Sequence, residues 1–184
     1  MCGCGSISKA MRIALACLAL ALSCAASAQP REHEVKAAFL FKFLSFVEFP
    51  QAVLPQNAPL TIGVVGAEEL AAELEEIVAG RSVDGRRVQV SRVREGEPWT
   101  GLHLVFFGRG EAPRLRELQR LAPQQPMLVV CEWDGALDSG AVVNFVRSEG
   151  RVRFDVALEH AERRGVRISP RMLAVARAVR PARL

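Results

Sequence analysis

HEVKAAFLFKFLSFVEFP, residues 33–50, contains five of the chain's nine Phe residues within eleven positions. On a helical wheel of about 100° per residue, its polar residues Glu34, Ser45 and Glu48 gather on one half. The other half holds Val35, Phe39, Leu40, Phe43, Leu44, Phe46 and Val47. Pro50 closes the segment, because the residue before a proline is disfavoured in the helical region. The pattern predicts a very apolar helix as the first element of the folded domain.

Phe41 departs from this pattern, because it projects on the polar side of the predicted helix beside Glu34 and Glu48. Packing of the helix against its own domain does not readily account for an aromatic side chain there. Two interpretations remain open. The segment is a buried first helix, or it also presents Phe41, flanked by Glu34 and Glu48, to a partner protein.

The residues before this helix have the three parts of a secretory signal peptide. Lys9 and Arg12 supply positive charge, residues 13–22 form an apolar core, and residues 26–28 (ASA) form a cleavage site. The apolar core is about ten residues long, whereas a bilayer span needs about 20. We therefore expect export, most simply to a bacterial periplasm, with cleavage after Ala28.

Cleavage there leaves 156 residues, which suffice for one domain with its own core. We expect residues 1–28 to be the signal peptide and residues 29–184 to form a single α/β domain. A lipoprotein anchored at Cys24 is the competing outcome, since ALSC at residues 21–24 resembles a lipobox. With cleavage after Ala28, Cys131 is the one cysteine left in the mature chain. It is either buried as a free thiol or crosslinks two chains.

The charge balance of the mature chain gives no support to nucleic-acid binding. Removing Lys9 and Arg12 from the 24 basic residues leaves 22 against 20 acidic ones. Nearly all the basic residues are arginines, and they are interleaved with Glu and Asp. A nucleic-acid-binding domain instead collects its basic residues in a patch or stripe.

The rest of the chain alternates between strand and helix patterns before it changes to consecutive strands. Strands are predicted over residues 60–65, 87–93, 102–107 and 127–131, with helices over residues 67–79 and 112–121. A hairpin follows over residues 141–146 and 151–158, then a short helix over residues 159–164. A last helix opens at Ser169-Pro170, and its apolar side consists of Met172, Leu173, Val175, Ala176 and Val179. The expected fold is α/β, with a mostly parallel sheet, an antiparallel edge hairpin and helices on both faces.

Catalysis is not expected from this sequence. The mature chain has three His, no Tyr and no close pairing of Ser, His and an acid that would activate a nucleophile. We expect no cofactor and no metal. Cys131, Glu132 and Asp134 match no standard spacing of metal ligands and are more consistent with a solvated turn. His103 lies inside an apolar strand, where a hydrogen-bonded core histidine is expected.

Arg151, Arg153 and Arg167 are the candidate ligand-binding residues for an anionic group. A guanidinium group recognises carboxylate or phosphate with two parallel hydrogen bonds. The alternative is that these arginines form ion pairs with nearby acids, namely Asp155, Glu159 and Glu162.

Several blocks of the mature chain carry a family resemblance. They are residues 34–40 (EVKAAFL) with Phe43, Phe46-Val47 and Phe49-Pro50, then Ile62-Gly63-Val64, His103, Val152-Arg153-Phe154, and Ile168-Ser169 with Leu173 and Ala176-Arg177. In this order, and over nearly the whole mature chain, they resemble the YfiR family. The opening and closing blocks are the distinctive ones.

The resemblance implies a periplasmic, non-enzymatic regulator of α/β fold that forms a homodimer. It implies a role in cyclic-di-GMP signalling and biofilm control, by binding the periplasmic part of a membrane-bound diguanylate cyclase similar to YfiN and repressing it. A YfiB-like outer-membrane lipoprotein would relieve the repression, and a sensor kinase is an alternative receptor. We expect Phe41 to contact the receptor and stabilise its inactive arrangement. A periplasmic sensor in which Arg153 and Arg167 hold an anionic metabolite is the alternative function, and the two are compatible.

Two positions depart from the family. Leu102, before His103, stands where the family often has Cys, so the cysteine pairing of its well-known members cannot form here. Phe41 stands where the family more often has Tyr, so the aromatic ring is kept without its hydroxyl.

Overall fold

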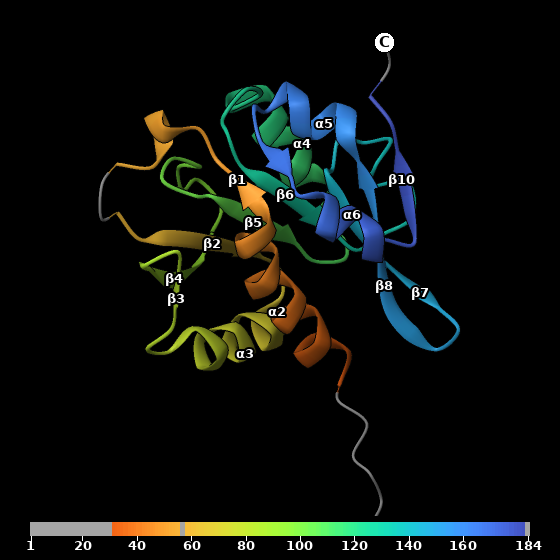
Figure 1. The fold of residues 1–184 in the computed structure, drawn as a ribbon, viewed down its shortest axis with the longest axis horizontal. Helices are drawn as coiled ribbons and strands as arrows, with labels where there is room; N and C mark the ends of the chain where they lie inside the picture. Colours follow the sequence, from red (N-terminus) through yellow and green to blue (C-terminus); the bar gives the residue numbers. More distant parts are fainter. Residues whose placement is uncertain (1–30, 56–57, 183–184) are drawn as a thin grey trace, which may run out of the picture. The chain divides into compact units, whose positions relative to one another are not determined.

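Eight strands form the main sheet in the computed structural model, which describes residues 31–55 and 58–182 (Figure 1). They are β2 (Leu60–Val65), β3 (Ser82–Val83), β4 (Arg86–Arg92), β5 (Leu104–Phe107), β6 (Leu128–Cys131), β7 (Val143–Ser148), β8 (Arg151–Ala157) and β10 (Ala178–Arg180). Their order is β10-β8-β7-β6-β5-β2-β4-β3. Strands β4, β2, β5, β6 and β7 run parallel to one another, β3 pairs with β4 in antiparallel orientation, and β7 and β8 form an antiparallel hairpin. This confirms the predicted α/β fold.

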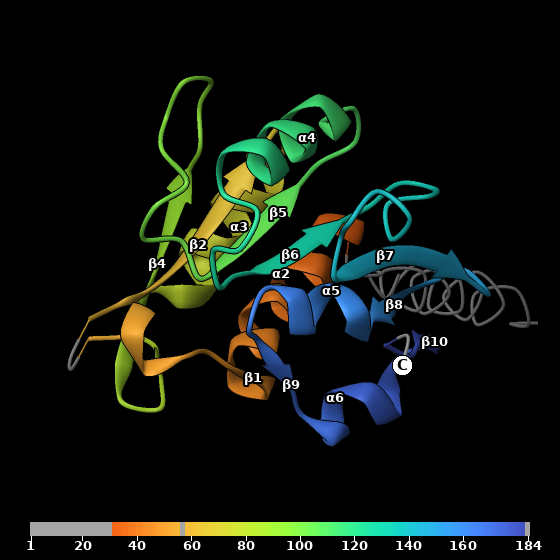
Figure 2. The same cartoon turned by 90° about the horizontal axis from the view of Figure 1, so that it is seen from above.

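Helices cover both faces of the sheet (Figure 2). They are α2 (Glu32–Phe43), α3 (Glu68–Val78), α4 (Ala112–Leu121), α5 (Leu158–Arg163) and α6 (Pro170–Val175), with short 3₁₀ turns η1 (Leu44–Phe46) and η2 (Gln51–Val53). Helix α2 packs along α3, and α4 lies on the opposite face of the sheet. This division follows from right-handed crossovers that leave β2 and β5 in opposite directions.

The Phe-rich helix α2 packs on the β7–β8 hairpin, as the buried-helix interpretation predicts. The ring of Phe43 meets that of Phe154 edge-on at a centroid distance of 4.9 Å, and Phe39 lies 6.0 Å from Phe145. Edge-to-face and tilted aromatic pairs add to the stabilisation from buried apolar area. The aromatic contacts join the first element of the domain to strands about a hundred residues later in the sequence.

The first and last helices are shorter than predicted. Helix α2 ends at Phe43, since a second, two-stranded sheet forms where strand β1 (Val47–Glu48) pairs with strand β9 (Arg167–Ile168). Helix α6 ends at Val175, because β10 pairs in parallel with β8 and places one more strand outside the hairpin. Strand pairing with distant residues therefore overrides the helical pattern at both ends.

Two buried side chains confirm predictions about the core. Cys131 is a fully buried free thiol, and burial raises its pKa. The Nδ1 atom of His103 accepts a hydrogen bond from the Thr61 N–H at 3.1 Å, and its Nε2 lies 3.3 Å from the Val53 carbonyl. His103 is therefore neutral with its proton on Nε2, and burial lowers its pKa.

The predicted signal peptide and Cys24 lie outside the described residues. Of the helices formed by residues 31–55 and 58–182, none combines the length and the apolar character that a membrane crossing requires.

Candidate functional site

A cleft of about 570 Å³ lies at the C-terminal ends of β2 and β5, beside the end of β6. The strand order reverses here, because the chain leaves β2 toward β4 on one side and leaves β5 toward β6 on the other. In open α/β sheets this is the place where ligands bind. The start of α2 forms another wall of the cleft.

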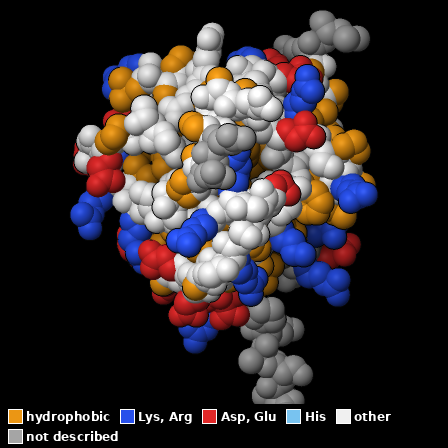
Figure 3. All heavy atoms as spheres, turned by 60° about the vertical axis from the view of Figure 1, so that its left-hand side comes forward, with side chains coloured by type: hydrophobic (Ala, Val, Ile, Leu, Met, Phe, Trp, Pro, Cys, Tyr) orange, Lys and Arg blue, Asp and Glu red, His pale blue; other side chains and the backbone are white. Residues whose placement is uncertain are grey.

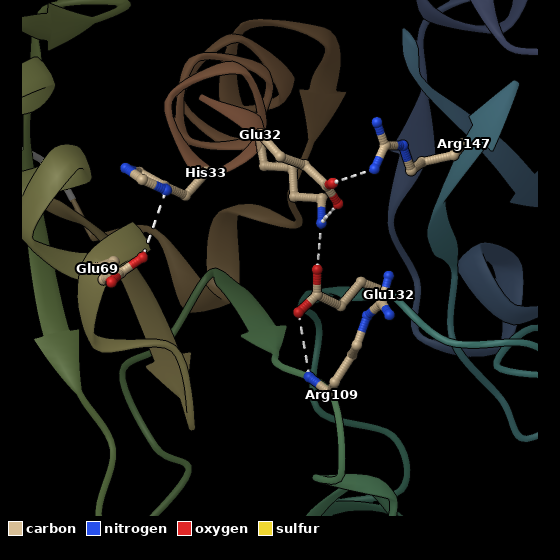
Figure 4. Close-up of polar contacts among 7 residues, drawn as sticks. Glu32, His33, Glu69, Arg109, Glu132 and Arg147 are labelled. Carbon is tan, nitrogen blue, oxygen red and sulfur yellow. Dashed lines mark hydrogen bonds and ion pairs between the residues drawn. The ribbon is translucent and has the colours of Figure 1, made fainter. Parts of the chain in front are cut away.

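Five charged residues form a network in this cleft, which we call the Lys36 cluster: Glu32, Lys36, Arg109, Glu132 and Arg147 (Figure 4). The Lys36 ammonium donates to Glu32 at 2.5 Å and also to Glu132, although its side chain is only 8% exposed. The other Glu132 oxygen accepts a hydrogen bond from the Arg109 backbone N–H at 3.1 Å. The Lys36 cluster thus ties the start of α2 to the ends of β5 and β6.

Glu32 is held in its charged form by the same network. Its hydrogen bond from Lys36 lowers its pKa, against the opposing effect of burial, and the charges of Arg147 and Arg109 act in the same direction as Lys36. The Arg147 guanidinium lies 3.4 Å from Glu32 and reaches it from β7. Three cations therefore accompany two carboxylates, which gives the cluster a formal net charge of +1.

The residues that line the cleft include no hydroxyl or thiol side chain. They offer cations, carboxylates and His33, whose Nδ1 lies 3.5 Å from Glu69 at the start of α3 (Figure 4). Such a set can bind charged groups and can position α2, but it supplies no Ser, Cys or Thr nucleophile next to a base.

His33, Glu34 and Glu73 are the described residues best placed to hold a metal, since their donor atoms lie within 4.8 Å of one another. One Glu34 oxygen, however, already accepts a hydrogen bond from the Arg31 N–H at 3.0 Å, which closes the first turn of α2. Acidic side chains around a histidine are common on helix surfaces, and we assign no metal to this group.

Phe41 is neither fully buried nor fully exposed. It is half-buried and packs against the core, and the Arg81 guanidinium lies 5.7 Å from its ring centroid. Glu34 caps the start of α2, about 10 Å along the helix from Phe41, whereas Glu48 is exposed on β1. The structure therefore spreads these three residues along one segment and does not gather them into one cluster.

The three candidate arginines lie in two different sheets. Arg151 and Arg153 are exposed on β8 in the main sheet, and Arg167 lies on β9 opposite Glu48. Among the described residues, none of the three forms an ion pair with a carboxylate. Asp155 instead binds Arg177, and Glu159 lies near Arg163. The predicted ion pairs of these arginines are thus not present.

The surface mixes charges of both signs. On the face drawn in Figure 3, basic and acidic side chains alternate, with apolar side chains between them. This matches the interleaved charges of the sequence.

A family model described as YfiR/HmsC-like matches residues 33–177, which is well over half of the chain. The matched span begins in α2 and ends just before β10, so it includes every member of the Lys36 cluster except Glu32. No curated protein matches the chain.

Proposed function

This chain belongs to the YfiR/HmsC-like family, and from that membership we propose that it binds the periplasmic part of a YfiN-like, membrane-bound diguanylate cyclase and represses it. The family is one of periplasmic regulators of cyclic-di-GMP signalling. The observation that carries the proposal is the extent of the match, which runs from the first helix of the domain to the residues before its last strand.

We propose that the receptor-binding surface follows the side of α2 that carries Glu34 and Phe41, next to α3, and continues on β1 at Glu48. Support comes from how α2 is held: its inner side packs on the hairpin, and its first turns are fixed by the Lys36 cluster. A surface that is rigid before binding loses little conformational entropy on association. A difference in affinity of about 1.4 kcal/mol between two receptor conformations changes their ratio tenfold, so repression requires no chemistry.

The first experiment is a pull-down of membrane proteins with the tagged chain, residues 29–184, followed by mass spectrometry. The proposal expects recovery of a membrane protein with a periplasmic domain and a diguanylate cyclase domain. A sensor kinase would keep the regulatory role and change the receptor. Reproducible recovery of no membrane partner by the folded protein would contradict the proposal.

Two substitutions test the surface. Phe41→Ala removes the half-buried ring, and Ala38→Arg adds bulk at an exposed position one turn earlier on α2 without removing a core contact. Both are expected to weaken receptor binding. Leu121→Ala is the matched control, because Leu121 is an apolar side chain of α4 that is 61% exposed. Full receptor binding by folded Phe41→Ala and Ala38→Arg proteins would rule out this surface.

We further propose a homodimer, and relief of repression by a YfiB-like outer-membrane lipoprotein. Light scattering on the purified chain tests the first, and loss of the receptor from the pull-down on addition of the lipoprotein tests the second. A monomer over the micromolar range, or a receptor complex that the lipoprotein leaves unchanged, would contradict the respective proposal.

A further inference from the structure

A second cavity, of about 530 Å³, lies between α4, residues 138–140 and α5. We call it the α4–α5 cavity. Its wall includes Arg116, His160, Arg163 and Arg164. A volume of roughly 300 to 1,000 Å³ is usual for sites that bind small molecules.

Arg164 is a buried cation without an acidic partner among the described residues. Arg164 as a residue is 5% exposed. Its Nη1 donates to the backbone carbonyls of Ala122 at 3.3 Å and Gln125 at 3.2 Å. No carboxylate of residues 31–55 or 58–182 lies within 4.0 Å of its nitrogen atoms. Charged groups are almost never buried unless they are paired, so this guanidinium is well placed for an anion.

The other groups of the wall leave an excess of positive charge. Arg116 is exposed, and its side chain makes no hydrogen bond or ion pair with any described residue. Asp138 is the acid of the wall, and Arg180 binds it at 2.5 Å. Arg163 lies 3.8 Å from Glu159 and forms an exposed ion pair with it.

His160 adds no charge of its own. Its Nε2 donates to the Leu137 carbonyl at 2.7 Å, and its Nδ1 faces the Arg163 guanidinium, which can only donate. The ring is therefore neutral. Burial lowers its pKa, and the neighbouring Arg163 and Arg164 act in the same direction. Arg116 and Arg164 are thus the two cations of the wall that form no ion pair with a described acid.

We propose that the α4–α5 cavity binds a small molecule that carries carboxylate or phosphate groups, with Arg164 at its buried end and Arg116 and Arg163 at its rim. Guanidinium groups bind such oxyanions with paired hydrogen bonds. These residues differ from Arg151 and Arg153, which lie on β8, and from Arg167, which lies on β9. The site stands independently of the proposed receptor, since it shares no residue with the α2 surface.

The test is isothermal titration of the chain, residues 29–184, with citrate and with inorganic phosphate at constant ionic strength. At least one of them is expected to bind saturably and to raise the melting temperature. Binding of citrate alone assigns a carboxylate ligand, and binding of phosphate alone assigns a phosphate ligand. Arg116→Gln is expected to weaken the binding about tenfold or more, and it removes no contact of the folded domain.

Arg153→Gln is the matched control, because it removes an exposed arginine of β8. It is expected to leave the affinity within about twofold. The proposal is overturned if neither probe binds saturably at millimolar concentration, or if Arg116→Gln and Arg163→Gln proteins bind as tightly as the unaltered protein. Neither outcome bears on receptor binding, so the two proposals fail separately.

Discussion

At the scale of single residues, Lys36 joins parts of the fold that are distant in sequence. Its ammonium lies between Glu32, four residues earlier on α2, and Glu132, 96 residues later. An ion pair of this kind contributes modestly as a pair, but removing one partner leaves a buried charge uncompensated. Lys36 therefore determines how firmly α2 is held against the sheet.

We expect Lys36→Met to lower the free energy of unfolding by roughly 2 to 4 kcal/mol. The reason is that Glu32 and Glu132 would face each other without the cation, and the Glu132 side chain is only 14% exposed. Urea denaturation at pH 7 measures the change. The double variant Lys36→Met, Glu132→Gln removes the uncompensated charge and is expected to recover much of the loss. A single variant as stable as the unaltered protein would contradict this role.

The same cluster predicts a pH dependence. Because the pKa of Glu32 is lowered from its ordinary 4.5, its contribution to stability is present above that pH and is lost as the pH falls through the lowered value. The stability difference between the unaltered protein and Lys36→Met should therefore shrink below about pH 4.5. A difference that stays constant down to pH 3 would show that Glu32 titrates normally.

His103 predicts a second pH dependence, at higher pH. Burial lowers its pKa from the ordinary 6.5, with the charge of Arg86 acting in the same direction. The unfolded chain then binds a proton that the folded protein does not, so stability falls as the pH falls through 6.5 toward the lowered value. Urea denaturation at pH 7.5 and 5.5 should give a smaller difference for His103→Gln than for the unaltered protein. Equal differences would contradict a neutral, buried His103.

At the scale of elements, the local sequence pattern predicted a helix or a strand correctly wherever pairing with distant residues did not turn a predicted helix into a strand. The predicted helix over residues 112–121 matches α4, and the predicted strand over residues 60–65 matches β2. The two overlong helices were wrong because Val47–Glu48 and Ala178–Arg180 pair with strands far away in sequence. Helical periodicity carries no information about such partners.

The candidate sites were predicted less well, for the same reason. The spacing of Glu32 and Lys36 by four residues is a local signal for an ion pair, but nothing near them indicates Glu132. Likewise, Arg164 follows a short helix with no sign in the sequence that Ala122 and Gln125 will accept its hydrogen bonds. Sites assembled from several elements need the tertiary structure.

The close approach of β2 and β5 at the cleft gives a prediction about an element. The Gly108 N–H donates to the Val65 carbonyl at 2.8 Å, and a Cβ at Gly108 would lie 2.5 Å from the Gly66 carbonyl oxygen. Gly108→Ala should therefore separate the strand ends and lower the free energy of unfolding by roughly 1 to 3 kcal/mol. Thermal and urea denaturation measure this.

Gly96→Ala is the control for that substitution. Gly96 has a φ of 81°, and a Cβ there would meet no atom within 4 Å. It is expected to cost only the conformational strain, about 1 kcal/mol. If Gly108→Ala is no more destabilising than Gly96→Ala, the close approach of the two strand ends does not constrain the fold.

At the scale of the whole molecule, the two proposed binding sites lie on different parts of the domain. The α2 surface, proposed for the receptor, and the α4–α5 cavity, proposed for an anion, share no residue. A ligand in the cavity can therefore be bound while α2 contacts a receptor, and it can change repression only through a difference in its affinity for free and receptor-bound protein.

Repression of a diguanylate cyclase is the central claim, and the level of cyclic-di-GMP in the bacterium that encodes this chain tests it most directly. Deletion of the chain should raise the level several-fold, and re-expression of the intact chain should restore it. Re-expression with Ala38→Arg should fail to restore it while the protein accumulates normally. A level that stays unchanged on both deletion and overproduction would contradict the account.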